Sequence, residues 1–472
     1  MNKTPHCRRS THLLVAVAFL ASCGGGVGSG GTGRSDFGLA AGTVNGFGSV
    51  IVDGVGYDDR NATVVSEIAP GADAIAEVRL GHRVSVEYET PGVAQVIHVD
   101  AAVSGPVASI GAGAIVVLGQ TIVVNTNGSA GPITAFGGYA LASDVRVGDP
   151  IDVHGLIVRR GSSYVIQATR IDKLAAAPAF LRVSGVVAAL SSSGARSFAL
   201  ASLKVDASVA TVVPGATMLA DGQTVTLLAR STSMSTPAGG GIQVQAAQVR
   251  VRALPQSFLD TYLSGAVSQL DALARTFVID GHAVSYAAAT ILPAPMSLLN
   301  GVYVQARGMT GADGTLQAAS VAVRDAGSDS EAELHGNISA LDATGATFTV
   351  RDVKVDAAGA SLRGCPATGL ANGLFVEVHG ATISTGVRAL TIQCEGESSG
   401  STVEREGKAS AVDLVARTFV LTPEGRSPIT VSWTDTTFFG GVTPATLAGR
   451  SVEVQGSLIG GGVAAMKVKL DD

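Results

Sequence analysis

Short runs in which apolar and polar residues alternate occur along most of the chain after about residue 39. Examples are Gln245–Val251, Gln317–Val323 and Ala464–Leu470, which end in alternations such as Gln-Val-Arg-Val. Successive side chains of a β-strand point to opposite faces of a sheet, so each run has one apolar and one polar face. The pattern predicts many short β-strands.

The first 22 residues follow a different pattern. A basic start with Arg8-Arg9 precedes eight apolar residues, Leu13–Leu20, and the small residues Ala21-Ser22. This order is typical of an export signal, and a bilayer span needs about 20 apolar residues. We therefore interpret residues 1–22 as a signal peptide. A short buried helix fits the following glycine run poorly, and the paired arginines leave a twin-arginine signal as a minor alternative.

A glycine-rich segment, residues 23–38, separates this signal from the rest. It has almost no side chains that could form a core, so we expect a flexible tether. The spacing of Gly26, Gly28 and Gly31 matches a dinucleotide-binding fingerprint, but the predicted strand and helix that such a site needs are missing on either side. We do not interpret it as a cofactor site.

One marker repeats along the chain: a glycine followed by apolar residues at positions +3 and +5 and usually by a small residue at +7. The marker begins at Gly81, Gly148, Gly222, Gly301, Gly373 and Gly449. Successive markers lie 67, 74, 79, 72 and 76 residues apart. Self-similarity at a regular period is the signature of a repeat protein, and we expect six units.

A second glycine, leading into a short apolar alternation, lies upstream in each unit. These glycines are Gly42, Gly105, Gly185, Gly265, Gly336 and, more weakly, Gly407. The later units add the segment Asp-x-x-x-x-Thr-Phe, at Asp271–Phe277, Asp342–Phe348 and Asp413–Phe419. These shared segments indicate duplication of one unit.

Each unit contains about five predicted strands, with glycines where strands must bend or cross closely. This arrangement favours an all-β chain of small five-stranded barrels like the oligonucleotide/oligosaccharide-binding (OB) fold, with a row of small open sandwiches as the alternative. We expect barrel repeats at residues 39–101, 102–175, 180–254, 262–326, 332–396 and 403–472.

Composition agrees with this prediction and narrows the function. The chain has 60 glycines, 46% hydrophobic and only 15% charged residues, so long helices are unexpected. Its 472 residues exceed what one core supports, which is about 250 to 300 residues. A formal net charge of -6 makes nucleic acid an unexpected partner, because phosphates require a basic surface.

Leu20-Ala21-Ser22-Cys23 resembles a bacterial lipobox. The resemblance implies that Cys23 is lipidated and becomes the first mature residue, and Gly24 favours the outer membrane. With the glycine and valine motifs described above, the chain from Leu39 to Asp472 resembles bacterial lipoproteins of the domain-of-unknown-function family 5666. That family has no known catalytic residues to transfer. Tyr88 replaces the small residue at +7 and Ala409 replaces the upstream valine, which suggests that the end units are caps.

Two further cysteines, Cys365 and Cys394, fall within one unit. In an oxidising compartment we expect a disulfide, which over 29 residues would contribute about 3 to 4 kcal/mol by the chain-entropy relation. The alternative is a metal or redox pair, although the spacing differs from C-x-x-C.

His335 and His379 each precede a marker glycine in that same unit, with Glu331, Glu333 and Glu377 nearby. Two histidines and one carboxylate could hold a metal ion. The favoured interpretation is that these polar residues lie on the outer, solvated face of their strands. His154 occupies the equivalent position in the second unit.

The chain has no H-E-x-x-H motif, and aromatic residues make up 4% with Trp433 as the one tryptophan. We expect no catalysis and no cofactor. The favoured role is an exported, lipid-anchored structural or interaction protein of the cell envelope, held to the membrane by its N-terminal anchor with an envelope protein or polysaccharide as partner. The alternative is a ligand-binding module for a polysaccharide or a metal.

Overall fold

The computed structural model describes residues 37–470 except 112, 192–195, 216, 238–239, 255–257, 294–297, 325–330, 395–401, 424–427, 435–436, 441 and 460–461. The predicted signal peptide, Cys23 and nearly all of the predicted tether lie outside these residues. Among the residues described, the helical elements are single 3-10 turns: η1 (Gly128–Ala130), η2 (Ala142–Asp144), η3 (Ser231–Ser233) and η5 (Pro444–Thr446). None of the described residues forms a helix with the length and hydropathy needed to cross a membrane.

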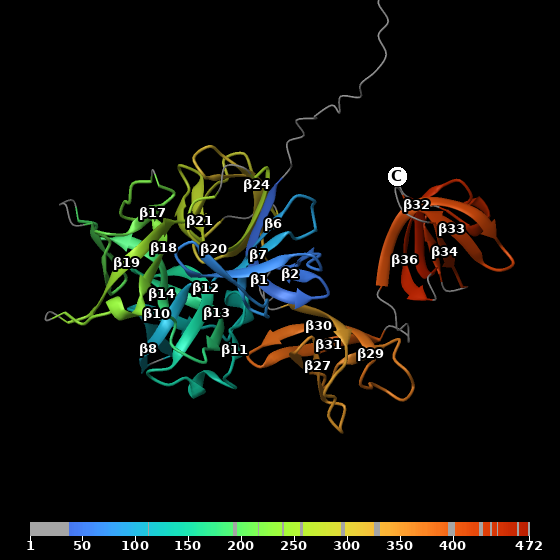
Figure 1. Ribbon diagram of the computed structural model, residues 1–472, viewed down its shortest axis with the longest axis horizontal. Coiled ribbons are helices and arrows are strands. Elements are labelled where there is room, and N and C mark those ends of the chain that lie inside the picture. The colour runs from blue at the N-terminus through green and yellow to red at the C-terminus, as the bar shows by residue number, and fades with distance from the viewer. Residues whose placement is uncertain are drawn as a thin grey trace, which may run out of the picture. The chain divides into compact units, whose positions relative to one another are not determined.

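The strands follow one another in sets, coloured from blue to red in Figure 1. The first set is β1 (Gly38–Phe47), β2 (Val50–Val52), β3 (Val55–Tyr57), β4 (Thr63–Ala69), β5 (Ala72–Ile75), β6 (Arg83–Tyr88) and β7 (Val96–Val99). The next is β8 (Val103–Gly111), β9 (Ala114–Val117), β10 (Gln120–Val124), β11 (Ala135–Gly137), β12 (Pro150–Arg160) and β13 (Ser163–Lys173). It is followed by β14 (Phe180–Ala188), β15 (Ser197–Leu200), β16 (Leu203–Asp206), β17 (Thr211–Val213), β18 (Thr224–Arg230) and β19 (Ile242–Val251).

Three similar sets complete the chain. They begin with β20 (Asp260–Asp271), β21 (Thr276–Ile279), β22 (His282–Ser285), β23 (Thr290–Leu292), β24 (Tyr303–Thr310) and β25 (Leu316–Val323). Next come β26 (Glu331–Asn337), β27 (Thr347–Val350), β28 (Val353–Asp356), β29 (Ser361–Arg363), β30 (Phe375–Ile383) and β31 (Gly386–Cys394). The last are β32 (Thr402–Asp413), β33 (Thr418–Thr422), β34 (Ile429–Ser432), β35 (Phe438–Gly440), β36 (Ser451–Ile459) and β37 (Gly462–Leu470).

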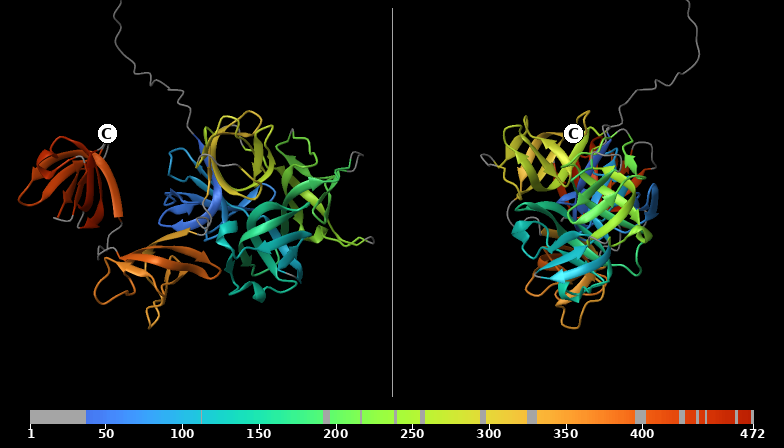
Figure 2. Two further views of the ribbon diagram at one scale, coloured as in Figure 1. Left: turned by 180° about the vertical axis from the view of Figure 1, so that it is seen from behind. Right: turned by 90° about the vertical axis from the view of Figure 1, so that its left-hand side faces the viewer.

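The pairing within the β8–β13 set closes a five-stranded barrel. β8 pairs with β9 and β9 with β10, both antiparallel; β10 runs parallel to β13, β13 pairs with β12, and β12 returns to β8. The short β11 adds to β13 beyond the end of β10. The β20–β25 set repeats this scheme and is seen as a closed ring in yellow in Figure 2. The predicted all-β fold of small five-stranded, OB-like barrels is confirmed.

The marker glycines of the sequence form the turn before the fourth strand of the barrel, which is β12 in the β8–β13 set. Gly148 has φ +91°, a left-handed conformation that favours glycine. Its N–H donates to the Val107 carbonyl, and the Val107 N–H donates to the Asp149 carbonyl. The same two-bond clasp joins Gly222 to Val187 and Gly301 to Val267. The turn glycine therefore contacts the valine two residues after the upstream glycine in each of these units.

The small residue at +7 has a different role. Gly155 lies at a register shift between β12 and β13, where a Cβ would lie 2.5 Å from the Gln167 carbonyl oxygen. The same bulge occurs at Gly308, Gly380 and Gly456. Because the neighbouring strand passes so closely, a side chain has no room there.

Aromatic and aliphatic side chains fill the barrel interiors. The phenylalanines of the repeated Asp-x-x-x-x-Thr-Phe segment, Phe277, Phe348 and Phe419, are among the largest fully buried side chains. Backbone pairing also joins separate sets, since β1 runs parallel to β20 and to β26, and β8 pairs with β14. Strand edges that would otherwise be free are thereby covered.

Candidate functional site

Two clusters of histidine and carboxylate side chains stand out among the described residues. We call His82, His154 and Asp172 the joint cluster, because they come from two different strand sets. We call Glu333, His335, Glu377 and His379 the strand-pair cluster, because they lie on β26 and β30. In the joint cluster, each of the three residues has a potential ligand atom within 4.8 Å of those of the other two. The same holds for Glu333, Glu377 and His379 in the strand-pair cluster.

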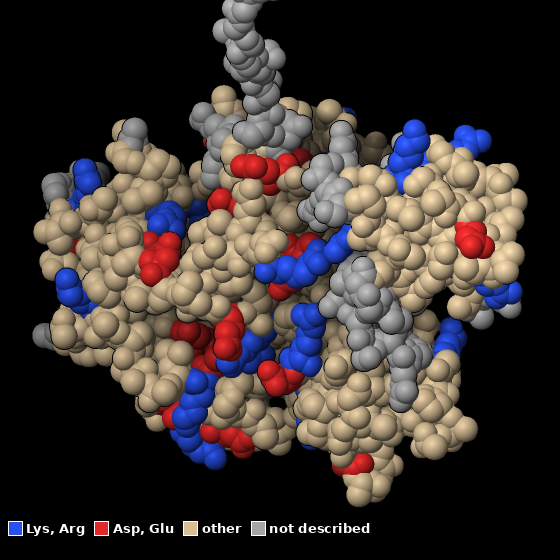
Figure 3. Space-filling model, turned by 45° about the vertical axis from the view of Figure 1, so that its right-hand side comes forward, with Lys and Arg blue, Asp and Glu red and all other residues tan. Residues whose placement is uncertain are grey.

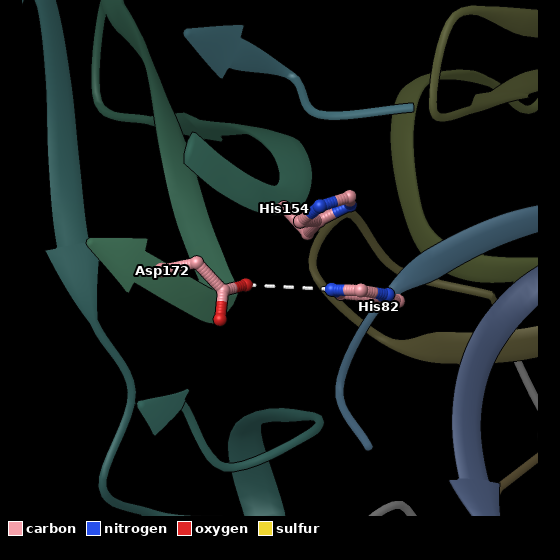
Figure 4. A group of neighbouring side chains, drawn as sticks. All are labelled: His82, His154 and Asp172. Atoms are coloured by element: carbon pink, nitrogen blue, oxygen red, sulfur yellow. Dashed lines mark hydrogen bonds and ion pairs between the residues drawn. The ribbon is translucent and has the colours of Figure 1, made fainter. Parts of the chain in front are cut away.

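The joint cluster forms where the turn before β6 packs against β12 and β13. His82 follows the turn glycine Gly81, whereas His154 precedes the β12 bulge and Asp172 lies near the end of β13. Figure 4 shows the His82 ring pointing at Asp172, with Nε2 and Oδ2 3.3 Å apart, and the His154 ring beside it. The two rings stack with centroids 4.3 Å apart.

Arg170 ties this contact together. Its Nε and Nη2 donate to the two oxygens of Asp172, each at 2.7 Å, and its Nη1 donates to the Leu80 carbonyl. Burial raises the pKa of Asp172, but hydrogen bonds from His82 and Arg170 outweigh it and hold the pKa well below its ordinary value. Asp172 is thus an ionised carboxylate already fully engaged by the protein.

The protonation of His82 is set by its neighbours. The Arg79 backbone N–H donates to His82 Nδ1 at 3.1 Å, so a neutral ring carries its proton on Nε2, toward Asp172. Burial lowers the pKa of His82 and of His154, which keeps both rings neutral at pH 7. A metal ion would have to displace the Nε2 proton and the Arg170 contacts together. The joint cluster is therefore built as a contact between strand sets and fits a metal poorly.

Two buried polar atoms beside the joint cluster have no partner among the described residues. They are Nδ1 of His154 and Oδ1 of Asp152. Burial also raises the pKa of Asp152, which a hydrogen bond from Ser104 partly offsets. Both residues line a hollow of about 500 Å³ with Ser66 and Glu77. This hollow can offer hydrogen bonds to a small polar molecule.

His154 corrects one expectation from the sequence. Its position on the outer face of a barrel predicted a solvated side chain, yet it is 3% exposed. The β12 face is covered by the turn that carries His82, because Thr169 Oγ1 donates to the Gly81 carbonyl at 2.7 Å and holds this turn in place. The sequence marker Gly81 located the turn, but its neighbour His82 and the partner Asp172 were missed.

The strand-pair cluster contains the two histidines proposed from the sequence as weak metal candidates. His335 Nε2 lies 2.6 Å from Glu333 Oε1, and His379 Nε2 lies 2.6 Å from Glu377 Oε1. The structure brings His335 and His379 onto one face of neighbouring strands, as the sequence suggested. Glu333 and Glu377 belong to the group, whereas Glu331 is not part of it.

The predicted disulfide is present. Cys365 and Cys394 are bonded with an S–S distance of 2.00 Å and join the segment after β29 to the end of β31. The cysteines therefore form a structural bond, and the alternative of a metal or redox pair is not supported.

Further buried charges join other strand sets. Glu67 on β4 contacts Arg250 at 2.8 Å, accepts from Gln248, and pairs with Arg182 at 3.5 Å. Asp280 pairs with Arg252 at 3.0 Å and with Arg83 at 3.4 Å. Each of these carboxylates binds two arginines that lie outside its own strand set, although Oδ1 of Asp280 and Nε of Arg83 have no hydrogen-bond partner among the described residues.

These observations define a class, a tandem all-β protein whose OB-like barrels contact one another through buried polar joints. Residues 104–172, 264–322 and 335–393 match the family model described as Domain of unknown function (DUF5666). The match recurs three times across the chain, as expected for a repeat protein built from this domain and as the sequence resemblance predicted.

Other comparisons add little. No curated protein matches the chain. A solved structure described as "drosophila Unr CSD456" is similar over 44% of this chain and 96% of its own, at 15% identity and a TM-score of 0.12. At that TM-score the likeness supports no conclusion about fold or function.

Proposed function

We propose that this chain is an exported, lipid-anchored cell-envelope protein with a structural or interaction role and no catalysis. The observation that carries the proposal is the set of buried polar joints, in which Glu67 and Asp280 bind arginines of other strand sets and Asp172 contacts His82 of another set. Joints of this kind order barrels relative to one another, which a scaffold needs and isolated domains do not.

Two further features support an envelope location. The sequence begins with an export pattern ending at Cys23, and the Cys365–Cys394 disulfide is of the kind that persists in oxidising compartments. A lipobox product carries several acyl chains, and more than one chain is needed for stable anchoring.

The face drawn in Figure 3 supports a protein or polysaccharide partner over a nucleic acid. On the face drawn in Figure 3, acidic and basic side chains lie next to one another and most of the remaining surface is uncharged. Nucleic acid binding requires a continuous basic surface, which this face does not offer.

The anchor is tested by Cys23→Ala in the native host, followed by membrane fractionation and labelling with a radioactive fatty acid. We expect the wild type to be labelled and recovered with membranes, and the variant to be unlabelled and released. An unlabelled wild type, or a variant that stays in the membrane fraction, would contradict the anchor.

The interaction role is tested by placing a photo-crosslinking amino acid at Leu273 or Val415, exposed tips that are 97% and 95% accessible. We expect discrete covalent adducts in intact cells that disappear in the Cys23→Ala background. Phe277, which is buried, is the matched control position. The absence of adducts at both tips would count against a scaffold that works through these surfaces.

A second candidate is binding of a polar saccharide in the hollow beside the joint cluster, favoured by the unpartnered atoms of Asp152 and His154. Titration with an N-acetylglucosamine disaccharide should perturb the histidine NMR signals of the wild type but not of Asp152→Ala. The exposed Asp73→Ala serves as control. Equal responses in all three proteins would eliminate this site.

A further inference from the structure

Histidine and glutamate alternate in the strand-pair cluster, both along each strand and across the two strands. In the β26–β30 register, Glu333 lies opposite His379 and His335 lies opposite Glu377. Residues two apart on a strand share a face, so all four side chains leave the barrel on the same side. Each imidazole therefore has one carboxylate along its strand and another across it.

We propose that Glu333, His335, Glu377 and His379 bind a divalent transition-metal ion of the Zn²⁺ type. Two imidazoles and two carboxylates form a complete tetrahedral ligand set, and all of them are ligand types that Zn²⁺ accepts. The proposal is independent of the scaffold role.

The distances suit such an ion. Zn–N and Zn–O bonds of about 2.0 to 2.2 Å place tetrahedral ligand atoms roughly 3.4 Å apart. In the cluster, the two contacts along the strands measure 2.6 Å, and His335 Nε2 lies 4.0 Å from Glu377 Oε1. The remaining separations within the Glu333, Glu377 and His379 group do not exceed 4.8 Å. Binding of an ion would require the four side chains to rotate until their ligand atoms reach this spacing.

The backbone beneath these side chains is held on several sides. β30 pairs with both β26 and β31, and β26 also pairs with β1. The hairpin turn between β1 and β2 lies against the His335 ring, since a Cβ on Gly48 would be 2.9 Å from His335 Cδ2. A rigid backbone with adjustable side chains lowers the conformational cost of binding an ion.

The cluster is also open to solvent. Exposed side-chain fractions are 28% for His335, 40% for Glu333, 22% for Glu377 and 50% for His379. An ion can enter without an opening motion. The guanidinium of Arg351 donates to the His335 and Gly48 carbonyls and not to the cluster carboxylates. This differs from the joint cluster, where Arg170 already neutralises Asp172.

Comparison of the strand sets shows that this face has other uses elsewhere. The position equivalent to His379 holds His154 in the β8–β13 set, where it stacks on His82. The position equivalent to His335 holds Ser264 in the β20–β25 set, where it donates to Asp53. In the β14–β19 set the position equivalent to Glu333 is Arg182, which binds Glu67. The β26–β31 set is the one whose sequence has histidine or glutamate at all four equivalent positions. A face used for barrel contacts in three other sets is thus available here for an ion.

The test is Zn²⁺ binding to the purified full chain, measured by competition with a chromogenic chelator. We expect one ion per chain, with affinity reduced at least about tenfold in His335→Gln, Glu377→Gln and His379→Gln. His98→Gln is the matched control, because His98 and Glu87 form a similar exposed pair, 3.7 Å apart, with only two ligands. Cadmium-113 NMR of the loaded protein should report nitrogen and oxygen ligands without sulfur.

Several outcomes would overturn the proposal. These are no binding by the wild type, undiminished binding in the His335→Gln/His379→Gln double variant, or a cadmium shift indicating cysteine. Loss of binding in His154→Gln with retention in His379→Gln would instead assign the ion to the joint cluster. Circular dichroism of each variant establishes that the barrels remain folded.

Discussion

At the residue scale, the marker glycine of each unit occupies the same kind of turn, as Gly81 and Gly222 show. Gly81, at φ +84°, and Gly222, at φ +87°, both occupy the turn that clasps the first strand. Their surroundings differ, because a Cβ on Gly81 would lie 2.5 Å from the Thr169 carbonyl oxygen, whereas a Cβ on Gly222 would meet no atom within 4 Å.

This difference predicts unequal effects of one substitution. Gly222→Ala should lower the free energy of unfolding by about 1 to 2 kcal/mol, the cost of a left-handed alanine. Gly81→Ala should cost more, because the added methyl also separates the turn from β13. Urea unfolding of both variants measures the difference, and equal losses would show that the packing against Thr169 is unimportant.

Buried histidines predict a dependence of stability on pH. Burial lowers the pKa of His154, and burial with repulsion from Arg252 lowers that of His282 to about 4. The unfolded chain then binds protons below pH 6.5 that the folded chain does not bind. The contribution of the neutral rings to the free energy of unfolding is therefore complete above pH 6.5, and it is lost as the pH falls toward 4.

We therefore expect the melting temperature to fall between pH 7 and pH 5, and His282→Gln to reduce that fall. His98 should act in the opposite direction, since the hydrogen bond that it donates to Glu87 raises its pKa, so its contribution to stability is present at low pH and lost as the pH rises. Thermal melts across this pH range on His282→Gln and His98→Gln compare the two signs directly.

At the element scale, the disulfide is the covalent addition to one barrel. Cys394 ends β31, the strand that pairs with β28, β29 and β30. The bridge to Cys365 therefore fixes the segment after β29 to the most highly paired strand of the set.

Cys365→Ser should lower the stability of this barrel by about 3 kcal/mol, as expected for a closed loop of 29 residues. Trp433 provides an internal control, because it is buried in the separate core of β32–β37. Hydrogen exchange of β30 and β31 should accelerate in the variant while the tryptophan fluorescence transition stays unchanged. A shift of both transitions would indicate that the two barrels unfold together.

At the scale of the whole molecule, buried ion pairs join sets that are distant in sequence. Glu67 is 7% exposed and lies between Arg182 and Arg250, more than 100 residues away in the chain. Removing Glu67 leaves Arg182 paired with Asp100 at 3.2 Å and leaves Arg250, 43% exposed, in contact with solvent, so the cost should lie below the typical cost of about 3 to 5 kcal/mol for a fully uncompensated buried charge.

Glu67→Ala should therefore loosen the contact between the β1–β7 and β14–β19 sets and increase cleavage of the connecting segments in limited proteolysis. Asp58→Ala is the control, because it removes only an exposed pair with Arg60, whose side chain is 76% exposed and whose contribution is about 0 to 1 kcal/mol. Equal proteolysis of both variants would show that the Glu67 joint does not order these barrels.

The sequence alone determined the all-β barrel fold, the positions of the turn and bulge glycines, the disulfide, and the placement of His335 and His379 on one face. These features depend on local alternation, on φ angles that glycine alone adopts easily, or on partners within one unit. Tertiary structure alone decided that His154 is buried against His82, that Asp172 contacts His82, and that Glu67 meets Arg182. Those contacts join different strand sets, and the period of a repeat describes the inside of a barrel without specifying which outer faces pack together.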